Sequence, residues 1–161
     1  MLHIYFALML SAFFQDSKFI VTSPAFKNEA GIPAKYTCQG KDVNPELNIS
    51  YIPEGTQSMV VLVDDPDAPN GTIDHWVVYN IEPTTVIKEN SVPGVQGKNY
   101  GGYKYMGPCP PMGMHRYFFK VYALDTKLDL KPGATKMQVQ DMMVDHILES
   151  AQLMGTYSKK K

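Results

Sequence analysis

The residues of this chain that could do chemistry stand where short segments rich in proline and glycine meet runs of strand-forming residues. Asp65 and Asp67 flank Pro66. Side chains two residues apart in an extended segment point to the same side, so we expect both carboxylates to face one cavity. Asp64 is a weaker candidate, because in a strand its side chain points the other way. The alternative interpretation is a turn in which the aspartates cap backbone N–H groups.

Two histidines and a tyrosine stand in equivalent positions further along the chain. His75 begins one predicted strand, and His115 and Tyr117 begin another after a segment rich in proline and glycine. Two histidines at equivalent strand starts favour a shared pocket over two unrelated structural histidines. His146 lies beside the apolar face of a predicted helix, where we expect a packing residue rather than a ligand.

Three classes of site use aspartate, histidine and tyrosine together. In an anion site, imidazole, backbone N–H and tyrosine hydroxyl groups donate to a phosphate or carboxylate, while the aspartates orient and protonate the histidines. In a metal site, two histidines and a carboxylate bind iron or manganese. Hydrolysis by an acid–base pair is the weakest class, because the sequence has neither a serine nucleophile elbow nor a His-Glu-x-x-His motif. We expect no cofactor, since no glycine-rich phosphate loop precedes a helix.

Composition and charge limit the function further. The 161 residues suffice for one domain with a hydrophobic core, and 44% of them are hydrophobic. The net charge of −1 provides no electrostatic attraction to nucleic acid. We therefore expect no nucleic-acid partner.

The sequence has two cysteines, too few for a zinc site. Cys38 and Cys109 both stand in turn segments. If they form a disulfide, the closed loop spans most of the domain, and the bond contributes roughly 4 kcal/mol of stability in the chain-entropy model. If the protein is cytosolic, free thiols are expected instead. The sequence leaves both alternatives open.

Residues 4–14 form an almost entirely apolar run. The run is too short to span a bilayer and has the length of a signal-peptide core. No lysine or arginine precedes it, however, and no small-x-small cleavage site follows it. The alternative is a segment that packs on the domain or on a second subunit. We therefore separate residues 1–18 from a domain of residues 19–161, and we favour export to the periplasm over retention in the cytoplasm.

Alternating and continuous apolar runs predict a mainly β protein. The predicted strands or extended segments cover residues 19–22, 32–37, 47–52, 59–63, 76–81, 86–87 and 117–124. The run 59–63 is continuously apolar and predicts a central strand. Residues 89–115 hold many glycines and prolines, and a long irregular connection of this kind usually carries function.

One helix is predicted near the C-terminus. Thr135 and Gln138 form a capping box, and apolar residues recur from Val139 to Ala151 at helical spacing. Gly155 ends the predicted helix. The whole pattern predicts an antiparallel β-sandwich with its site at one end, one C-terminal helix and short peripheral helical turns.

Three motifs are specific enough to compare with known families. They are Asp65-Pro66-Asp67-Ala68-Pro69, Asp74-His75-Trp76 and the run Gly-Pro-Cys-Pro-Pro-Met-Gly-Met-His-Arg-Tyr that ends at Tyr117. Together they resemble the phosphatidylethanolamine-binding protein family, in its prokaryotic-type, Raf-kinase-inhibitor-like branch. Agreement in residues 22–26, 33–40 and 147–157 extends the resemblance over nearly the whole chain, from about residue 19 to residue 157.

The resemblance implies a β-sandwich with a small anion pocket at one end, which in relatives takes phosphate, acetate or a phosphorylethanolamine head group. Carried over residue by residue, the lining of this pocket is Asp65, Asp67, His75, Pro111, His115 and Tyr117. The resemblance also implies a cis peptide bond before Pro69, which would fix the aspartate loop against the pocket. A homodimer is a further implication of the family.

The chain also departs from the animal members of the family. The loop before His115 is shorter, and the C-terminal helix of the animal proteins has no clear counterpart beyond Tyr157. Phospholipid selectivity and kinase inhibition are therefore not carried over. We expect a non-enzymatic binding protein whose pocket takes a phosphate, a phosphorylated head group or a carboxylate at the end of a larger ligand. The alternatives are a regulator or inhibitor of a protein partner, such as a kinase or protease, that uses the pocket rim, and a metal-dependent enzyme that uses the Asp/His cluster.

Overall fold

The structure is a computed structural model that describes residues 18–160. The predicted signal or packing segment at the N-terminus lies outside the described residues. Within the described part of the chain, no helix has the length and the apolar character needed to cross a bilayer.

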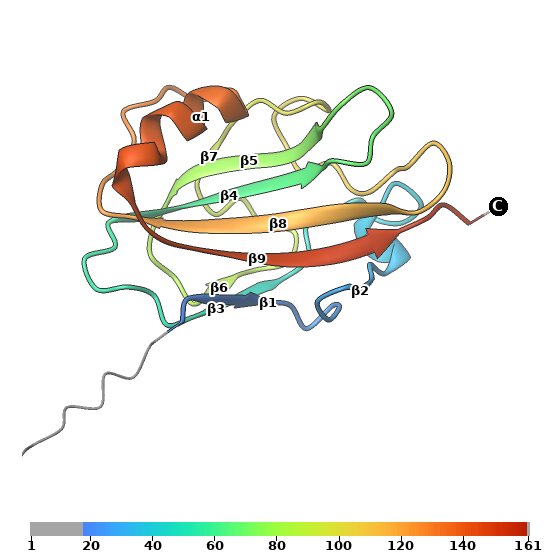
Figure 1. The fold of residues 1–161 in the computed structure, drawn as a ribbon, viewed down its shortest axis with the longest axis horizontal. Helices are drawn as coiled ribbons and strands as arrows, with labels where there is room; N and C mark the ends of the chain where they lie inside the picture. The colour runs from blue at the N-terminus through green and yellow to red at the C-terminus, as the bar shows by residue number, and fades with distance from the viewer. Residues whose placement is uncertain (1–17, 161) are drawn as a thin grey trace, which may run out of the picture.

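Two β-sheets form the body of the molecule (Figure 1). The smaller sheet is antiparallel and has the order β1 (Ile20–Thr22), β3 (Leu47–Ser50) and β6 (Val86–Ile87). The larger sheet has the order β2 (Ala30–Gly31), β9 (Ile147–Tyr157), β8 (His115–Leu124), β4 (Ser58–Asp65), β5 (Ile73–Ile81) and β7 (Val95–Gln96). The predicted antiparallel β-sandwich is confirmed, and the short β2 adds one parallel pairing with β9.

Helix α1 (Lys136–Met143) begins at the predicted capping box, where the Gln138 backbone N–H donates to the Thr135 hydroxyl oxygen at 3.3 Å. It buries Val139 and Met143 against the outer face of the larger sheet. The helix therefore covers the face of that sheet that does not pack on the smaller one.

The predicted extent of this helix, up to Gly155, is wrong. The chain leaves the α-helix after Met143, makes one 3-10 turn, η2 (Val144–His146), and enters β9. Strand β9 pairs antiparallel with β8 along almost its whole length. These backbone hydrogen bonds to a neighbouring strand override the local apolar spacing, which by itself suggests a continued helix.

Strand β4 is buried along its whole length at the centre of the larger sheet. Met59, Val61 and Val63 point into the core between the two sheets. Val60 and Leu62 point to the opposite face, under α1. The continuous apolar run therefore reflects a central strand that is covered on both faces, as predicted.

Short helical turns lie at the periphery, as expected. The segment 32–37, predicted as extended, holds a 3-10 turn, η1 (Ala34–Tyr36). The Tyr36 backbone N–H donates to the Pro33 carbonyl at 3.0 Å, so the chain turns directly after this proline. In η2, His146 is 43% exposed and forms an ion pair with Asp125 at 2.8 Å, so it is a surface residue rather than the packing residue expected from sequence.

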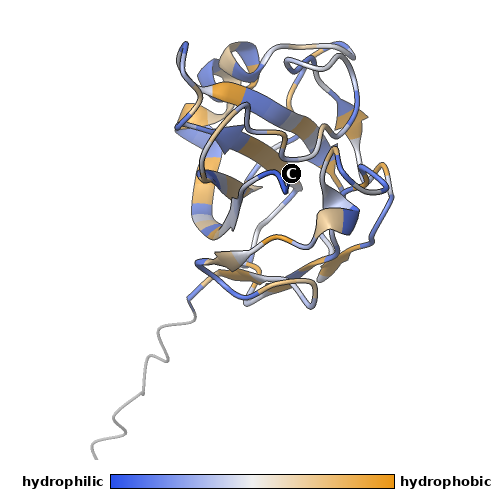
Figure 2. Ribbon diagram, turned by 90° about the vertical axis from the view of Figure 1, so that its right-hand side faces the viewer, coloured by the Kyte–Doolittle hydropathy of each residue, from blue (hydrophilic) through white to orange (hydrophobic). Residues whose placement is uncertain are grey.

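The antiparallel register brings one end of each of four strands, β4, β5, β8 and β9, to the same end of the larger sheet. Asp65 at the end of β4 pairs with Ile73 at the start of β5, and His115 at the start of β8 pairs with Tyr157 at the end of β9. This end of the sheet lies on the right of Figure 1 and faces the viewer in Figure 2. The candidate site residues identified from the sequence therefore gather at one end of the sandwich.

Candidate functional site

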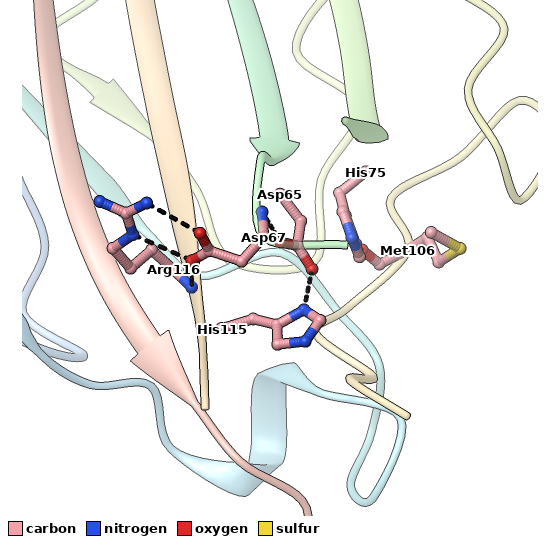
Figure 3. Close-up of polar contacts among 6 residues, drawn as sticks. All are labelled: Asp65, Asp67, His75, Met106, His115 and Arg116. Atoms are coloured by element: carbon pink, nitrogen blue, oxygen red, sulfur yellow. Dashed lines mark hydrogen bonds and ion pairs between the residues drawn. The ribbon is translucent and has the colours of Figure 1, made fainter. Parts of the chain in front are cut away.

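Asp65 and His115 form a buried pair at this end of the sandwich (Figure 3). The His115 Nδ1 atom lies 2.8 Å from Asp65 Oδ2, and the two side chains are 8% and 4% exposed. The other carboxylate oxygen of Asp65 accepts the Asp67 backbone N–H at 2.9 Å. Asp65 therefore does both things considered from sequence, since one oxygen caps a turn and the other orients a histidine.

His75 is held by the backbone of the segment between β7 and β8, the later part of the connection over residues 89–115, which is interrupted by β7. Its Nδ1 atom lies 2.7 Å from the Met106 carbonyl oxygen, so Nδ1 carries the proton and donates. Burial lowers the pKa of His75 below its ordinary value of 6.5. The ring is therefore neutral at pH 7, and its Nε2 atom is a hydrogen-bond acceptor.

Tyr117 lies beside His75 and is fully buried, with the two rings edge to face and their centroids 5.1 Å apart. Its hydroxyl group forms no hydrogen bond with any residue between 18 and 160. Burial, and then the charge of Asp65, raise the pKa of Tyr117 above its ordinary value. The hydroxyl thus stays protonated. It lies near the Asp65 carboxylate and the Cys109 backbone, but within residues 18–160 it makes no hydrogen bond of normal geometry, which is costly for a buried donor.

These side chains surround one cavity of about 310 Å³. Five of the residues predicted from sequence line it, namely Asp65, His75, Pro111, His115 and Tyr117. The remaining lining residues are Ala68, Pro69, Asn70, Ile73, Tyr100, Met106, Cys109 and Pro110. Of these, Met106 had no signal in the sequence, because it contributes a backbone carbonyl that any residue type could provide.

Asp67 does not line the cavity, and the expectation that both carboxylates face it is wrong for this residue. Both oxygens of Asp67 bond to Arg116, with Nη2 at 2.8 Å, Nε at 2.9 Å and the backbone N–H at 2.9 Å (Figure 3). These hydrogen bonds from Arg116 lower the pKa of Asp67 to about 2. The expectation fails because residues 66–67 form a turn, where the two-residue alternation of an extended strand does not apply.

The peptide bond before Pro69 is trans, so the expected cis bond is not found. Pro69 is the second residue of a turn in which the Gly71 backbone N–H donates to the Ala68 carbonyl at 3.2 Å. A trans proline suits this position because its fixed φ angle matches the turn, whereas a cis proline belongs one position later.

Cys38 and Cys109 form a disulfide, which decides between the two alternatives left open by the sequence. Cys109 is one of the cavity-lining residues. The bond therefore attaches the wall of the cavity to the segment that follows η1.

Asp64 points to the opposite face of the sheet, as its position in β4 predicts. Its Oδ2 atom binds Lys120 at 3.0 Å and Lys136 at 3.1 Å, and Lys136 also binds Asp74 at 2.7 Å. This network is separate from the cavity. Among residues 18–160, no group of three or more His, Cys, Asp or Glu side chains is arranged to hold a metal ion.

Comparison with known proteins agrees with this geometry. The sequence model of the phosphatidylethanolamine-binding protein family matches residues 22–158. The UPF0098 protein PH1269 of Pyrococcus horikoshii is 43% identical over 158 residues, which cover 91% of this chain and 80% of the relative.

Two crystal structures share the fold. A phosphatidylethanolamine-binding protein homolog from Chlamydia trachomatis, CT736, has a TM-score of 0.86 and 41% identity, covering 89% of this chain and 99% of its own. YbcL of E. coli, described as a member of the mammalian family, has a TM-score of 0.82 and 32% identity, covering 89% of this chain and 100% of its own. The chain belongs to the phosphatidylethanolamine-binding protein family.

Proposed function

We propose that this protein is a non-enzymatic binding protein whose cavity takes a phosphate, phosphorylethanolamine-type or carboxylate group. The observation that carries the proposal is the hydroxyl group of Tyr117 at the cavity, a fully buried donor without a hydrogen-bond partner in the described part of the chain. A buried donor of this kind costs free energy in the empty protein, and a ligand oxygen that accepts a hydrogen bond from it recovers that cost.

The two histidines add complementary groups. The Asp65 carboxylate accepts a hydrogen bond from His115 Nδ1, so Nε2 is the ring atom left to contact a ligand. The neutral His75 offers Nε2 as an acceptor. A phosphate monoanion, with oxygens that accept and one hydroxyl that donates, matches this combination of groups.

The size of the cavity supports a ligand larger than inorganic phosphate. Its volume of about 310 Å³ exceeds what one phosphate group fills, and Ile73, Met106 and Pro110 give it apolar walls. Pockets with apolar walls and a few polar groups are typical of small-molecule sites. The anionic group is therefore the end of a larger ligand.

Isothermal titration calorimetry tests the proposal. The purified protein, freed of metal by chelation, is titrated with phosphate, phosphorylethanolamine and acetate, with the Tyr117→Phe variant measured in parallel. We expect binding by the wild type that is strongly reduced in the variant. Absence of binding by all three probes in the wild type would overturn the proposal. Metal analysis before chelation tests the metal-dependent enzyme considered from sequence, which requires a near-stoichiometric metal ion.

A second candidate function is regulation of a protein partner through the pocket rim. Large apolar side chains are exposed at the cavity and in the segment that follows its lining residue Pro111. The lining residue Tyr100 is 76% exposed, and Met112 and Met114 are 78% and 67% exposed. Exposed methionine and tyrosine are common at protein-binding surfaces. A pull-down in which Met112→Ser and Met114→Ser remove a partner, while phosphate binding is retained, would favour this candidate.

A further inference from the structure

The Cys38–Cys109 disulfide joins two exposed residues and belongs to the cavity wall. Both cysteines are exposed residues, and Cys109 lines the cavity next to Pro110 and Pro111. A thiolate reductant can reach the sulfur atoms of an exposed disulfide, which is why such bonds are often labile and regulatory. This bond combines that accessibility with a position at the candidate binding site.

Before the disulfide, hydrogen bonds hold the chain in place. The Met106 backbone N–H donates to the His75 carbonyl at 2.9 Å, and the Gly107 backbone N–H donates to Asp42 Oδ1 at 2.6 Å. Gly107 also lies so close to the Tyr36 carbonyl oxygen that a Cβ atom would be 2.4 Å from it. This part of the connection stays packed on the domain without help from the disulfide.

After the disulfide, the wall has no comparable support. The last backbone hydrogen bond before it joins the Cys38 N–H to the Pro108 carbonyl at 3.2 Å. Residues 109–114 then form no hydrogen bond with any other described residue, until His115 enters the pairing of β8 with β9. Pro110 is buried, but residues 111–114 are exposed, so the disulfide and the packing of Pro110 are what attach this segment, which carries Pro111 and leads into His115.

We propose that reduction of the Cys38–Cys109 disulfide releases residues 109–114 and weakens ligand binding, so that the pocket is under redox control. The inference rests on the proposed function, because it takes the cavity to be an anion site. The reductant is a dithiol. One of its thiolates attacks a sulfur atom of the disulfide, the S–S bond breaks, and a mixed disulfide forms. The second thiolate of the reductant then attacks the mixed disulfide, so that the reductant ends as a cyclic disulfide and both cysteines, after proton uptake, end as thiols.

The expected loss of affinity follows from the fraction of molecules in which residues 109–114 adopt the conformation that binds the ligand. If the released segment adopts the pocket conformation about a tenth of the time, the affinity for the ligand falls about tenfold. The sheets should keep their structure, because the residues before the disulfide are fixed independently.

The test compares oxidised protein with protein reduced by dithiothreitol. Calorimetry measures the affinity for inorganic phosphate, 15N NMR relaxation measures the backbone order of Cys109, Met112, Gly113 and Met114, and hydrogen–deuterium exchange measures the protection of β8, β9 and α1 as a reference. The Cys38→Ser/Cys109→Ser double variant is the matched control, since it should behave like the reduced wild type and ignore dithiothreitol.

Weaker phosphate binding on reduction, with lower backbone order in residues 109–114 and unchanged exchange in β8, β9 and α1, would support the proposal. Equal affinity and equal backbone order in both states would overturn it. Faster exchange spread over β8, β9 and α1 would also overturn it, because the disulfide would then stabilise the whole domain. If the oxidised protein binds no phosphate, the proposed anion site fails by itself, and the relaxation data still decide whether reduction releases the wall.

Discussion

Asp65 Oδ2 lies 2.8 Å from His115 Nδ1, and both side chains are almost completely buried. The pair joins the end of β4 to the start of β8, two neighbouring strands of the larger sheet. A buried carboxylate keeps its charge at low cost only when a partner donates to it. The pair therefore ties the orientation of a candidate ligand group to the stability of the sheet.

Replacing His115 should affect stability as well as binding. From sequence alone, His115 lies at a loop mouth, so His115→Ala is expected to abolish anion binding with little loss of fold. The structure changes the expectation about the fold, because the His115→Ala variant leaves the carboxylate of Asp65 buried without its partner. We expect the free energy of unfolding to fall by about 1–3 kcal/mol, as measured by urea unfolding.

A double-mutant cycle with Asp65→Asn isolates the pair. In the Asp65→Asn background, position 65 has no carboxylate that could lose its partner. The His115→Ala substitution should therefore lower the free energy of unfolding less in this background than in the wild type. We expect a coupling of about 1 kcal/mol or more between the two substitutions. Additive effects within about 0.5 kcal/mol would contradict the buried pair.

Removing the hydroxyl of Tyr117 should separate binding from stability. Tyr117→Phe deletes a buried donor that has no hydrogen-bond partner among residues 18–160, so the free energy of unfolding should stay constant or rise slightly. The affinity for phosphate should fall about tenfold or more, since one charge-assisted hydrogen bond contributes about 1.5–3 kcal/mol. Thermal unfolding and calorimetry on the same samples measure the two effects.

Tyr79→Phe is the matched control for this substitution. Tyr79 is equally buried, but its hydroxyl donates to the Lys131 carbonyl, away from the cavity. Its removal should lower the free energy of unfolding by about 1 kcal/mol and leave phosphate binding unchanged. If both variants lost stability equally and kept their affinity, the unpaired hydroxyl of Tyr117 would have no role in binding.

The sheets were largely predictable because strand signals are local. The alternation or continuity of apolar residues in β3, β4, β5 and β8 is written directly in the sequence. Strand β9 was not predictable in this way, because its residues also fit the spacing of a helix. What makes it a strand is its long pairing with β8, and a single sequence does not show which segments pair.

The site was predictable to a similar degree. Residue types and their positions at strand ends indicated Asp65, His75, His115 and Tyr117, and all four line one cavity. The side to which Asp67 points depends on the turn geometry and on Arg116, a partner 49 residues away. Contacts of this kind arise only in the folded chain, so no local pattern could have excluded Asp67.

His75 should make stability depend on pH. Because burial lowers the pKa of His75 below 6.5, the unfolded chain binds a proton at a higher pH than the folded chain does. Stability from this residue is therefore complete above about pH 6.5 and declines as the pH falls below that value. Urea unfolding between pH 7.5 and pH 5, at about half-unit steps, measures the decline.

The His75→Asn variant is the control for this dependence. The asparagine amide nitrogen occupies the position of Nδ1, so it keeps an N–H donor for the Met106 carbonyl but does not titrate. Its stability should change less than that of the wild type over the same pH range. Parallel profiles for the two proteins would mean that another group causes the decline.

Asp67→Asn should leave ligand binding intact, whereas Asp65→Asn should weaken it. Asp67 is 28% exposed and its partner Arg116 is 53% exposed, so the loss of their ion pair should cost less than about 1 kcal/mol. Because the pKa of Asp67 is lowered to about 2, the pair stabilises the fold above about pH 4 and this contribution disappears as the pH falls towards 2, below the range in which His75 titrates. Phosphate titration of both variants at pH 7 tests the difference. If Asp67→Asn lost as much affinity as Asp65→Asn, Asp67 would have to contribute to ligand binding, as the family resemblance implies.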